Sequence, residues 1–132
     1  MNKEPIWLET REVEFINHQL VSAFGGLAGG VRDHTLLEAA IARPLNQWAY
    51  DEPPPNLFDL AAAYCFGVCK GHAFHDGNKR TAHAAATVFL LNNGFRHETE
   101  ESDVVSMVVA LAEDQVSESD MAEWFRRTSV SI

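Results

Sequence analysis

The segment 60–91, LAAAYCFGVCKGHAFHDGNKRTAHAAATVFLL, consists of two almost wholly apolar runs separated by a polar stretch. The first run, 60–69, carries no charge, and a helix that is apolar on every side is typical of the middle of a bundle. The second run predicts another strong helix, which ends at Gly94. We therefore expect 60–71 and 78–93 to form a central antiparallel pair of helices, joined by the polar stretch.

Helical spacing also marks the N-terminal part of the chain. The apolar residues of 10–24 recur with the period of a helix, and the glycines of 25–30 predict a loop after it. Asp33 is suited to cap a second helix. That helix should end at Arg43, because Pro44 cannot continue it and restricts the residue before it.

The remaining segments complete a helical pattern. The stretch 46–56 contains three consecutive prolines and predicts an irregular exposed segment. Asp59 is expected to cap the first central helix. Further helices are expected over 102–114 and over 117–127, where Ser117 begins a capping-box pattern. Weak strand signals occur only at 6–9 and 95–99.

Composition and length bound the class of protein. With 132 residues and 46% hydrophobic residues, we expect a single all-α domain over 1–132, with about six helices and little or no strand. The net charge of −9 argues against nucleic-acid binding and against a polybasic membrane anchor. With no signal-peptide pattern and no membrane-spanning run, the expected location is cytoplasmic. Cys65 and Cys69 are expected to be buried neighbouring thiols.

The polar stretch has the composition of an anion site. It places Asp76, Gly77, Asn78, Lys79 and Arg80 at the start of the second central helix. Free backbone N–H groups and the helix dipole attract anions there, and glycine allows a close approach. The two cations stand where the dipole disfavours them, which indicates that they bind something negative.

Other residues of the stretch add catalytic groups. Asp76 is a hard oxygen ligand of the kind that holds Mg²⁺ beside phosphate oxygens. His72 precedes the anion site, and a neutral imidazole there can take a proton from an attacking hydroxyl. Phe74 is expected to point into the core. A base, a metal carboxylate and cations beside an anion site together predict phosphoryl or nucleotidyl transfer.

Three other interpretations of the stretch remain open at this point. A P-loop would need a different glycine spacing and a preceding strand. A zinc site could use His72, His75 and His83, but no recognised zinc spacing is present. In the purely structural interpretation, Asp76 caps the helix and the other charges are solvated.

The polar stretch resembles the Fic/Doc family motif, H-x-F-x-[D/E]-[G/A]-N-x-R. The matching residues are His72, Phe74, Asp76, Gly77, Asn78 and Arg80. The segments 25–33, 40–52 and 57–74 also look like the corresponding Doc-type stretches, and the family is helical. The resemblance therefore covers most of the chain and agrees with the helical pattern.

The resemblance implies a reaction and a role for each motif residue. Fic proteins transfer part of a nucleotide, here ATP, to a hydroxyl of a target protein. By the resemblance, His72 is the general base and Asp76 holds Mg²⁺. The Gly77–Asn78 backbone, the Asn78 side chain and Arg80 would then bind the phosphates.

The position after Asn78 selects between branches of the family. Most members have glycine there and transfer AMP, whereas Lys79 resembles the Doc (death-on-curing) branch. That resemblance implies a toxin that transfers the γ-phosphate of ATP to a serine or threonine of elongation factor Tu and blocks translation. His83 stands where AMP-transferring members have a second arginine, which also favours the kinase, while Gly77 matches those members. AMP transfer remains the alternative, and a silent binding protein is a third.

The resemblance also has consequences for partners. The inhibitory motif of many Fic proteins is not matched, since Thr10 and Glu14 are followed by Phe15. A separate antitoxin is therefore implied. The segment 46–56 stands where the resemblance suggests a target-docking flap. His75 is expected at the rim of the site, and the histidines outside the motif are expected at the surface or at helix ends: His18, His34 and His97.

Overall fold

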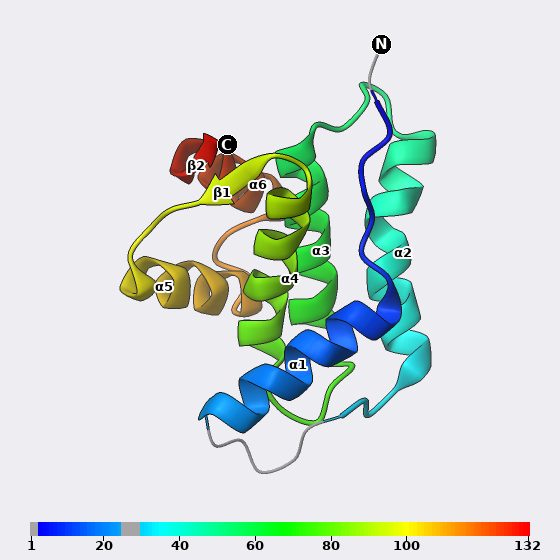
Figure 1. Cartoon of the computed structure of the whole chain (residues 1–132), viewed down its shortest axis with the longest axis vertical. Coiled ribbons are helices and arrows are strands. Elements are labelled where there is room, and N and C mark those ends of the chain that lie inside the picture. The colour runs from blue at the N-terminus through cyan, green and yellow to red at the C-terminus, as the bar shows by residue number, and fades with distance from the viewer. Residues whose placement is uncertain (1–2, 25–29) are drawn as a thin grey trace.

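The computed structural model describes residues 3–24 and 30–132. Their elements are α1 (Thr10–Phe24), α2 (His34–Tyr50), α3 (Leu57–Gly71), α4 (Asn78–Asn92), β1 (Phe95–His97), α5 (Glu101–Ala112), α6 (Glu118–Thr128) and β2 (Ser129–Ser131). The predicted all-α architecture of about six helices with little strand is confirmed (Figure 1). Of the loop predicted over 25–30, all but Gly30 lies outside the described residues.

Helix α3 is the centre of the bundle because its sequence is apolar on nearly every side. It packs against α4, α2 and α6 (Figure 1). Gly67 lets α2 approach closely, since a Cβ at that position would lie 3.1 Å from the Cα of Ala40. Cys65 and Cys69 are buried free thiols, as expected. Burial raises the pKa of both thiols, so they remain protonated core residues.

Helices α3 and α4 are neighbours joined at one end by the loop 72–77, as predicted (Figure 1). The expected cap at Asp59 is wrong by three residues, because the chain enters α3 at Asn56. The Asn56 Oδ1 accepts a hydrogen bond from the Asp59 N–H (2.8 Å), and the Asp59 carboxylate accepts one from the Asn56 N–H (3.0 Å). This reciprocal capping box fixes the first turn of α3. The second helix of the pair, α4, ends at Asn92, two residues before the predicted end at Gly94.

Helix α2 does not end before Pro44 but continues to Tyr50. The predicted end at Arg43 is wrong because side chains on both sides of the proline form tertiary contacts. Arg43 Nε and Gln47 Nε2 both donate to the carboxylate of Glu118 in α6, over 3.2 and 2.8 Å. Pro44 itself is buried. These contacts and this burial offset the cost of about 3 kcal/mol that a proline carries inside a helix.

The C-terminal part of the chain covers the far side of the central pair. Ser117 caps α6 with its hydroxyl, as the sequence predicts. The chain then enters β2, which pairs antiparallel with β1 so that His97 lies opposite Ser129. The weak strand signal at 95–99 therefore corresponds to a real strand, whereas the signal at 6–9 does not, because that segment pairs with no strand among the described residues.

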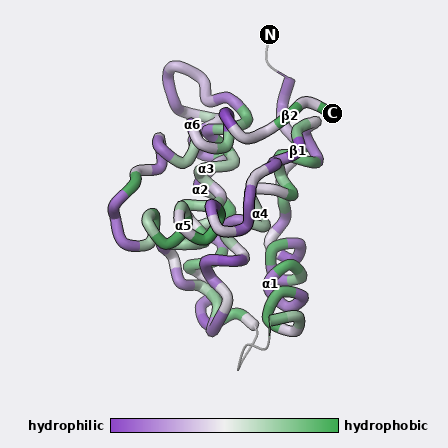
Figure 2. Tube along the Cα trace, turned by 90° about the vertical axis from the view of Figure 1, so that its left-hand side faces the viewer, coloured by the Kyte–Doolittle hydropathy of each residue, from purple (hydrophilic) through white to green (hydrophobic). Residues whose placement is uncertain are grey.

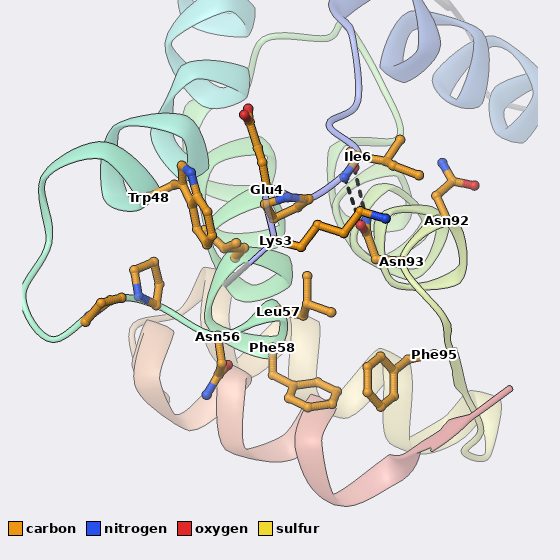
Figure 3. Close-up of a pocket in the computed structure, with 14 residues that line it drawn as sticks. Lys3, Glu4, Ile6, Trp48, Asn56, Leu57, Phe58, Asn92, Asn93 and Phe95 are labelled. Carbon is orange, nitrogen blue, oxygen red and sulfur yellow. Dashed lines mark hydrogen bonds between the residues drawn. The ribbon is translucent and has the colours of Figure 1, made fainter. Parts of the chain in front are cut away.

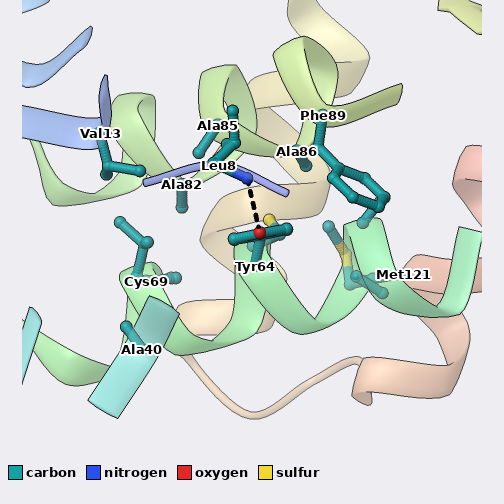
Figure 4. Close-up of a cluster of buried hydrophobic side chains, with 14 of the residues drawn as sticks. Leu8, Val13, Ala40, Tyr64, Cys69, Ala82, Ala85, Ala86, Phe89 and Met121 are labelled. Carbon is teal, nitrogen blue, oxygen red and sulfur yellow. Dashed lines mark hydrogen bonds between the residues drawn. The ribbon is translucent and has the colours of Figure 1, made fainter. Parts of the chain in front are cut away.

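The extended segment before α1 crosses the core (Figure 4). The Leu8 N–H donates to the hydroxyl of Tyr64, a fully buried side chain of α3, over 3.0 Å. Burial raises the pKa of Tyr64 to about 12, against the lowering effect of the Leu8 contact. The hydroxyl therefore stays neutral and satisfies a backbone N–H that would otherwise be buried without a partner.

Helix α1 is amphipathic, and its turns alternate between hydrophobic and hydrophilic colouring in Figure 2. Val13 and Val21 are buried on its inner face together with the polar side chain of Asn17. Phe15 and Phe24 are exposed. A buried amide on an otherwise apolar face requires hydrogen-bond partners, and those partners lie in the α3–α4 loop.

Candidate active site

The loop between the central helices begins with a left-handed residue. His72 is the C-cap of α3, with φ 51° and ψ 43°, and its side chain is exposed, as is that of His75. The Arg32 guanidinium donates from Nε to the carbonyl oxygen of His72 over 2.9 Å. The histidine predicted to act as the base is therefore accessible to a substrate.

The side chain of Asn78 closes the loop from within. Its Oδ1 accepts from the Phe74 N–H and its Nδ2 donates to the Phe74 carbonyl, both over 3.0 Å. Phe74 is only 2% exposed, which confirms that it anchors the loop in the core. The Asn78 side-chain amide is already hydrogen-bonded to the N–H and the carbonyl of Phe74. A phosphate contact of this side chain, as predicted, would have to be made in addition to these two bonds.

Gly77 provides the left-handed turn that leads into α4. Its φ is 75°, and it is the N-cap of α4, so this helix begins on a residue without a side chain. A Cβ at Gly77 would lie 3.2 Å from a methyl group of Val21 and 3.4 Å from the Asn17 amide. The interpretation in which Asp76 caps α4 is wrong, because the N-cap residue is Gly77 and no side chain caps this helix.

Asn17 is a site residue that the sequence did not reveal. Its amide Nδ2 donates to the carbonyl of Asp76 (2.9 Å) and to the hydroxyl of Thr81 (3.1 Å). Its Oδ1 accepts from the Gly30 N–H (3.4 Å). One buried side chain on α1 thereby connects the loop, the first turn of α4 and the segment before α2. Its position on an apolar helical face was the only available signal.

Two exposed cations stand in the first turn of α4, as predicted. Lys79 and Arg80 are both exposed, and no acidic residue accompanies them in that turn. The Arg80 guanidinium lies over the ring of Phe24, 3.8 Å from its centroid, in a cation–π contact. The site therefore presents positive charge at the end of a helix where the dipole is also positive.

Asp76 lies immediately before this turn and is half-buried. Its carboxylate accepts a hydrogen bond from the Gly77 N–H over 2.7 Å. A single carboxylate beside a phosphate site is the usual protein contribution to a Mg²⁺ centre, so the donor chemistry fits that ion. Within the described part of the chain, no three His, Cys, Asp or Glu side chains gather as a metal-binding group.

His83 and His97 form a half-buried pair, so the expectation that His97 is a surface residue is wrong. Their facing nitrogens, Nε2 of His83 and Nδ1 of His97, are 3.1 Å apart. Trp124 and Phe125 cover both rings. Burial lowers the pKa of His83 to about 4, and burial with the neighbouring His83 lowers the pKa of His97 to about 4. Both imidazoles are neutral at pH 7.

The hydrogen bonds around the pair define its tautomers. The Thr128 hydroxyl donates to the Trp124 carbonyl (2.6 Å), so its oxygen accepts from the His97 Nε2–H (2.7 Å). His97 Nδ1 is then an acceptor, and His83 Nε2–H donates to it. The side-chain N–H of His83 is therefore directed at His97.

The segment 46–56 is not beside the active-site loop, so the expected flap position is wrong. Its first five residues complete α2, and the rest precedes α3. The fifteen residues of α3 separate it from the loop, a length of roughly 22 Å at 1.5 Å per residue. Figure 1 shows the two connections at opposite ends of the bundle. Because α3 leads away from 46–56 towards the active-site loop, residues 46–56 cannot form a flap over that loop.

A different segment lies along the loop. Val31 pairs with Phe74 in an isolated antiparallel bridge, and the His75 N–H donates to the Gly30 carbonyl (3.1 Å). At the far end, 46–56 instead borders a cavity of about 580 Å³, whose walls include Trp48, Phe58 and Phe95 (Figure 3). The backbone that flanks the candidate site is thus that of residues 30–33.

The fold and the loop geometry define a Fic-type protein, and comparison with known families agrees. A family model described as the Fic/DOC family matches residues 7–90, so the chain belongs to the Fic/Doc family. It is 36% identical over 107 residues to "Protein kinase doc" of Escherichia phage P1, covering 81% of this chain and 82% of that protein. It is 44% identical over 85 residues to "Toxin Doc" of Mycolicibacterium smegmatis, covering 61% of this chain and 65% of that protein. No helix in the described residues is both long and apolar enough to span a membrane.

Proposed function

We propose that this protein is a Doc-type toxin that phosphorylates a serine or threonine hydroxyl of a target protein with the γ-phosphate of ATP. Lys79, directly after Asn78 in the first turn of α4, is the observation that carries the proposal. The names of the two relatives, a protein kinase and a toxin, support it. We further propose one domain over 1–132, acting in the cytoplasm on elongation factor Tu, with which the resemblance associates this branch.

The proposed reaction uses groups from the loop and from α4. His72 accepts the proton of the target hydroxyl, whose oxygen forms a bond to the γ-phosphorus. The bond from that phosphorus to the bridging oxygen of ADP breaks, and ADP leaves. Lys79 and Arg80 stabilise the negative charge on the transferring group. Asp76 would hold Mg²⁺, which neutralises phosphate charge when bound.

Backbone geometry contributes to phosphate binding in this proposal. Gly77 allows the chain to turn with its N–H groups at the start of α4, where an anion is stabilised by the helix terminus. Asn78 keeps this turn rigid through its two bonds to Phe74. The loop is thereby preorganised, which reduces the cost of reorganisation during the reaction.

AMP transfer is the second candidate function. Gly77 favours it, because AMP-transferring members share this glycine. His83 disfavours it, since the residue at the position of their second arginine directs its side-chain N–H to His97. A catalytically silent binding protein is the third candidate, and the accessible His72 disfavours it.

A separate antitoxin is the proposed inhibitor. A groove of about 300 Å³ adjoins Lys79 and Arg80 and is lined mainly by apolar side chains of α1, α4 and α5, including Leu20, Phe24 and Val105. Phe24 and Val105 are exposed. An antitoxin segment with apolar anchors and an acidic group fits this surface, because it would bury the apolar side chains and pair with the cations.

The discriminating experiment supplies Mg²⁺, elongation factor Tu and ATP labelled at either the α or the γ phosphate. Label on the target from γ-labelled ATP alone supports the kinase. Label from α-labelled ATP contradicts the kinase and supports AMP transfer. No label from either nucleotide supports the silent binding protein. His72→Asn should abolish transfer and keep the fold, because asparagine tolerates the left-handed backbone. His75→Asn, at the neighbouring exposed position, is the matched control and should retain activity. Transfer that persists in the His72 variant would exclude the general-base role.

Lys79→Gly tests the choice of phosphate directly. If Lys79 selects the γ-phosphate, this variant should lose γ-transfer while it stays folded, because the side chain is exposed and glycine in a helix costs only about 1 kcal/mol. Unchanged γ-transfer by the glycine variant would contradict the role given to Lys79.

A further inference from the structure

The proposed base, His72, has a backbone conformation that needs support from its surroundings. Its φ of 51° lies in the left-handed region, which a residue with a side chain adopts only at a cost. Gly71, which would adopt it freely, stands one position earlier in the chain. Such conformations persist where neighbouring groups hold them.

Arg32 supplies that support with both its side chain and its backbone. The guanidinium donates from Nε, over 2.9 Å, and from Nη2 to the carbonyl oxygen of His72. The Arg32 N–H donates to the carbonyl of the next residue, Ala73, over 2.7 Å, and the Asp33 N–H adds a bond to the same oxygen (3.1 Å). Two successive carbonyls of the loop are therefore bound from one residue.

The guanidinium bond is unusual for an exposed arginine of this chain. Arg11 forms an ion pair with Glu9 (2.8 Å), and Arg96 forms one with Glu98 (2.7 Å). Arg32 instead binds a main-chain carbonyl with two nitrogens. Charged donors form stronger hydrogen bonds than neutral donors, so this contact is suited to hold a strained peptide unit.

We infer that Arg32 is the positioning residue for His72, fixing the 72–73 peptide so that the imidazole leaves the loop in one direction. The part of this inference that concerns catalysis rests on the proposed function. The part that concerns the loop can be tested without any activity. Arg32 does not need to touch the nucleotide or the target in this role.

The first test measures amide hydrogen exchange in the loop. Phe74 and His75 donate their N–H groups to Asn78 and Gly30, so their exchange rates report whether the loop keeps its shape. Arg32→Ala should raise both rates by about tenfold, as expected for losing one charge-assisted bond. Arg11→Ala is the matched control and should leave them unchanged. Rates in the Arg32 variant equal to those of the wild type would overturn the inference, whatever the protein's activity.

The second test measures phosphate transfer from ATP to elongation factor Tu. Arg32→Ala should lower kcat by up to about a hundredfold, the size of effect that misplacing a catalytic group produces. The KM for ATP should stay within about twofold, because a residue that only positions the base makes no contact with the bound nucleotide. Methylguanidinium should partly restore kcat in this variant and not in His72→Asn. A raised KM with unchanged kcat would assign Arg32 to nucleotide binding and overturn the positioning role.

These two tests separate the inference from the proposed function. If the wild type transfers no phosphate, the proposed function fails, and the exchange rates alone decide the structural part. Arg32→Lys keeps the charge but donates from a single nitrogen, so it should fall between wild type and alanine in both measurements. Equal behaviour of the lysine and wild-type proteins would show that charge, and not the two-nitrogen contact, is sufficient, and would overturn the geometric argument.

Discussion

The half-buried pair of His83 and His97 should make this protein lose stability between pH 7 and pH 5. The pKa of each histidine is about 4 in the folded chain, below the ordinary value of 6.5. The unfolded chain therefore binds more protons than the folded chain between these values. The contribution of the two neutral histidines to the free energy of unfolding is therefore complete above pH 6.5, and it is lost as the pH falls towards 4.

The size of the loss follows from the two pKa values. At pH 5 an unfolded histidine is almost fully protonated, while His83 and His97 in the folded protein are mostly neutral. Linkage gives about 2 kcal/mol lost for each group between pH 7 and pH 5. Both rings are partly accessible, which reduces the expected loss to about 1–2 kcal/mol each.

Urea unfolding followed by circular dichroism at pH 7, 6 and 5 measures this loss. The variants His83→Gln and His97→Gln should each be less stable at pH 7, and each should lose less stability on acidification than the wild type. His18→Gln, at an exposed position of α1, is the matched control and should follow the wild-type curve. Parallel loss of stability in the wild type and in both pair variants would refute the reasoning.

Three further substitutions test the packing that holds the site. Tyr64→Phe should cost about 1–3 kcal/mol in urea unfolding, because it leaves the buried Leu8 N–H without its acceptor. Gly67→Ala should lower the melting temperature, since its Cβ would lie 3.1 Å from the backbone of α2 and overpacking costs about 1–3 kcal/mol. Asn17→Ala should cost about 1–3 kcal/mol and speed amide exchange in 72–77, because the Asp76 carbonyl loses its donor.

Much of the fold could be predicted because its signals are local. The apolar run of α3 and the caps at Asp33 and Ser117 depend on residues close in sequence. Such features follow from periodicity and from the short side chains that accept backbone hydrogen bonds. The motif residues of the loop could be located for the same reason, since they lie within nine consecutive positions.

Apart from the cap of α3, which is displaced by three residues from Asp59 to Asn56, the errors concern contacts between residues far apart in sequence. Pro44 remains inside a helix because Glu118 binds the side chains on either side of it, which the local pattern of α2 cannot indicate. His97 is half-buried because α6 brings aromatic rings over it. Asn17 and Arg32 act on the loop from other elements, and their neighbours in sequence say nothing about that loop.

The start of α4 differs from the starts of α3 and α6 in its cap and in its charges. Helices α3 and α6 each begin with a capping box and acidic residues in the first turn. Helix α4 begins on Gly77, has Lys79 and Arg80 in its first turn, and uses the Asn78 side chain to bind Phe74. These choices oppose the helix dipole and give up the capping side chain. An anion bound at this turn would compensate for both, so the residues that weaken the isolated helix are the same residues that the proposed phosphate site requires.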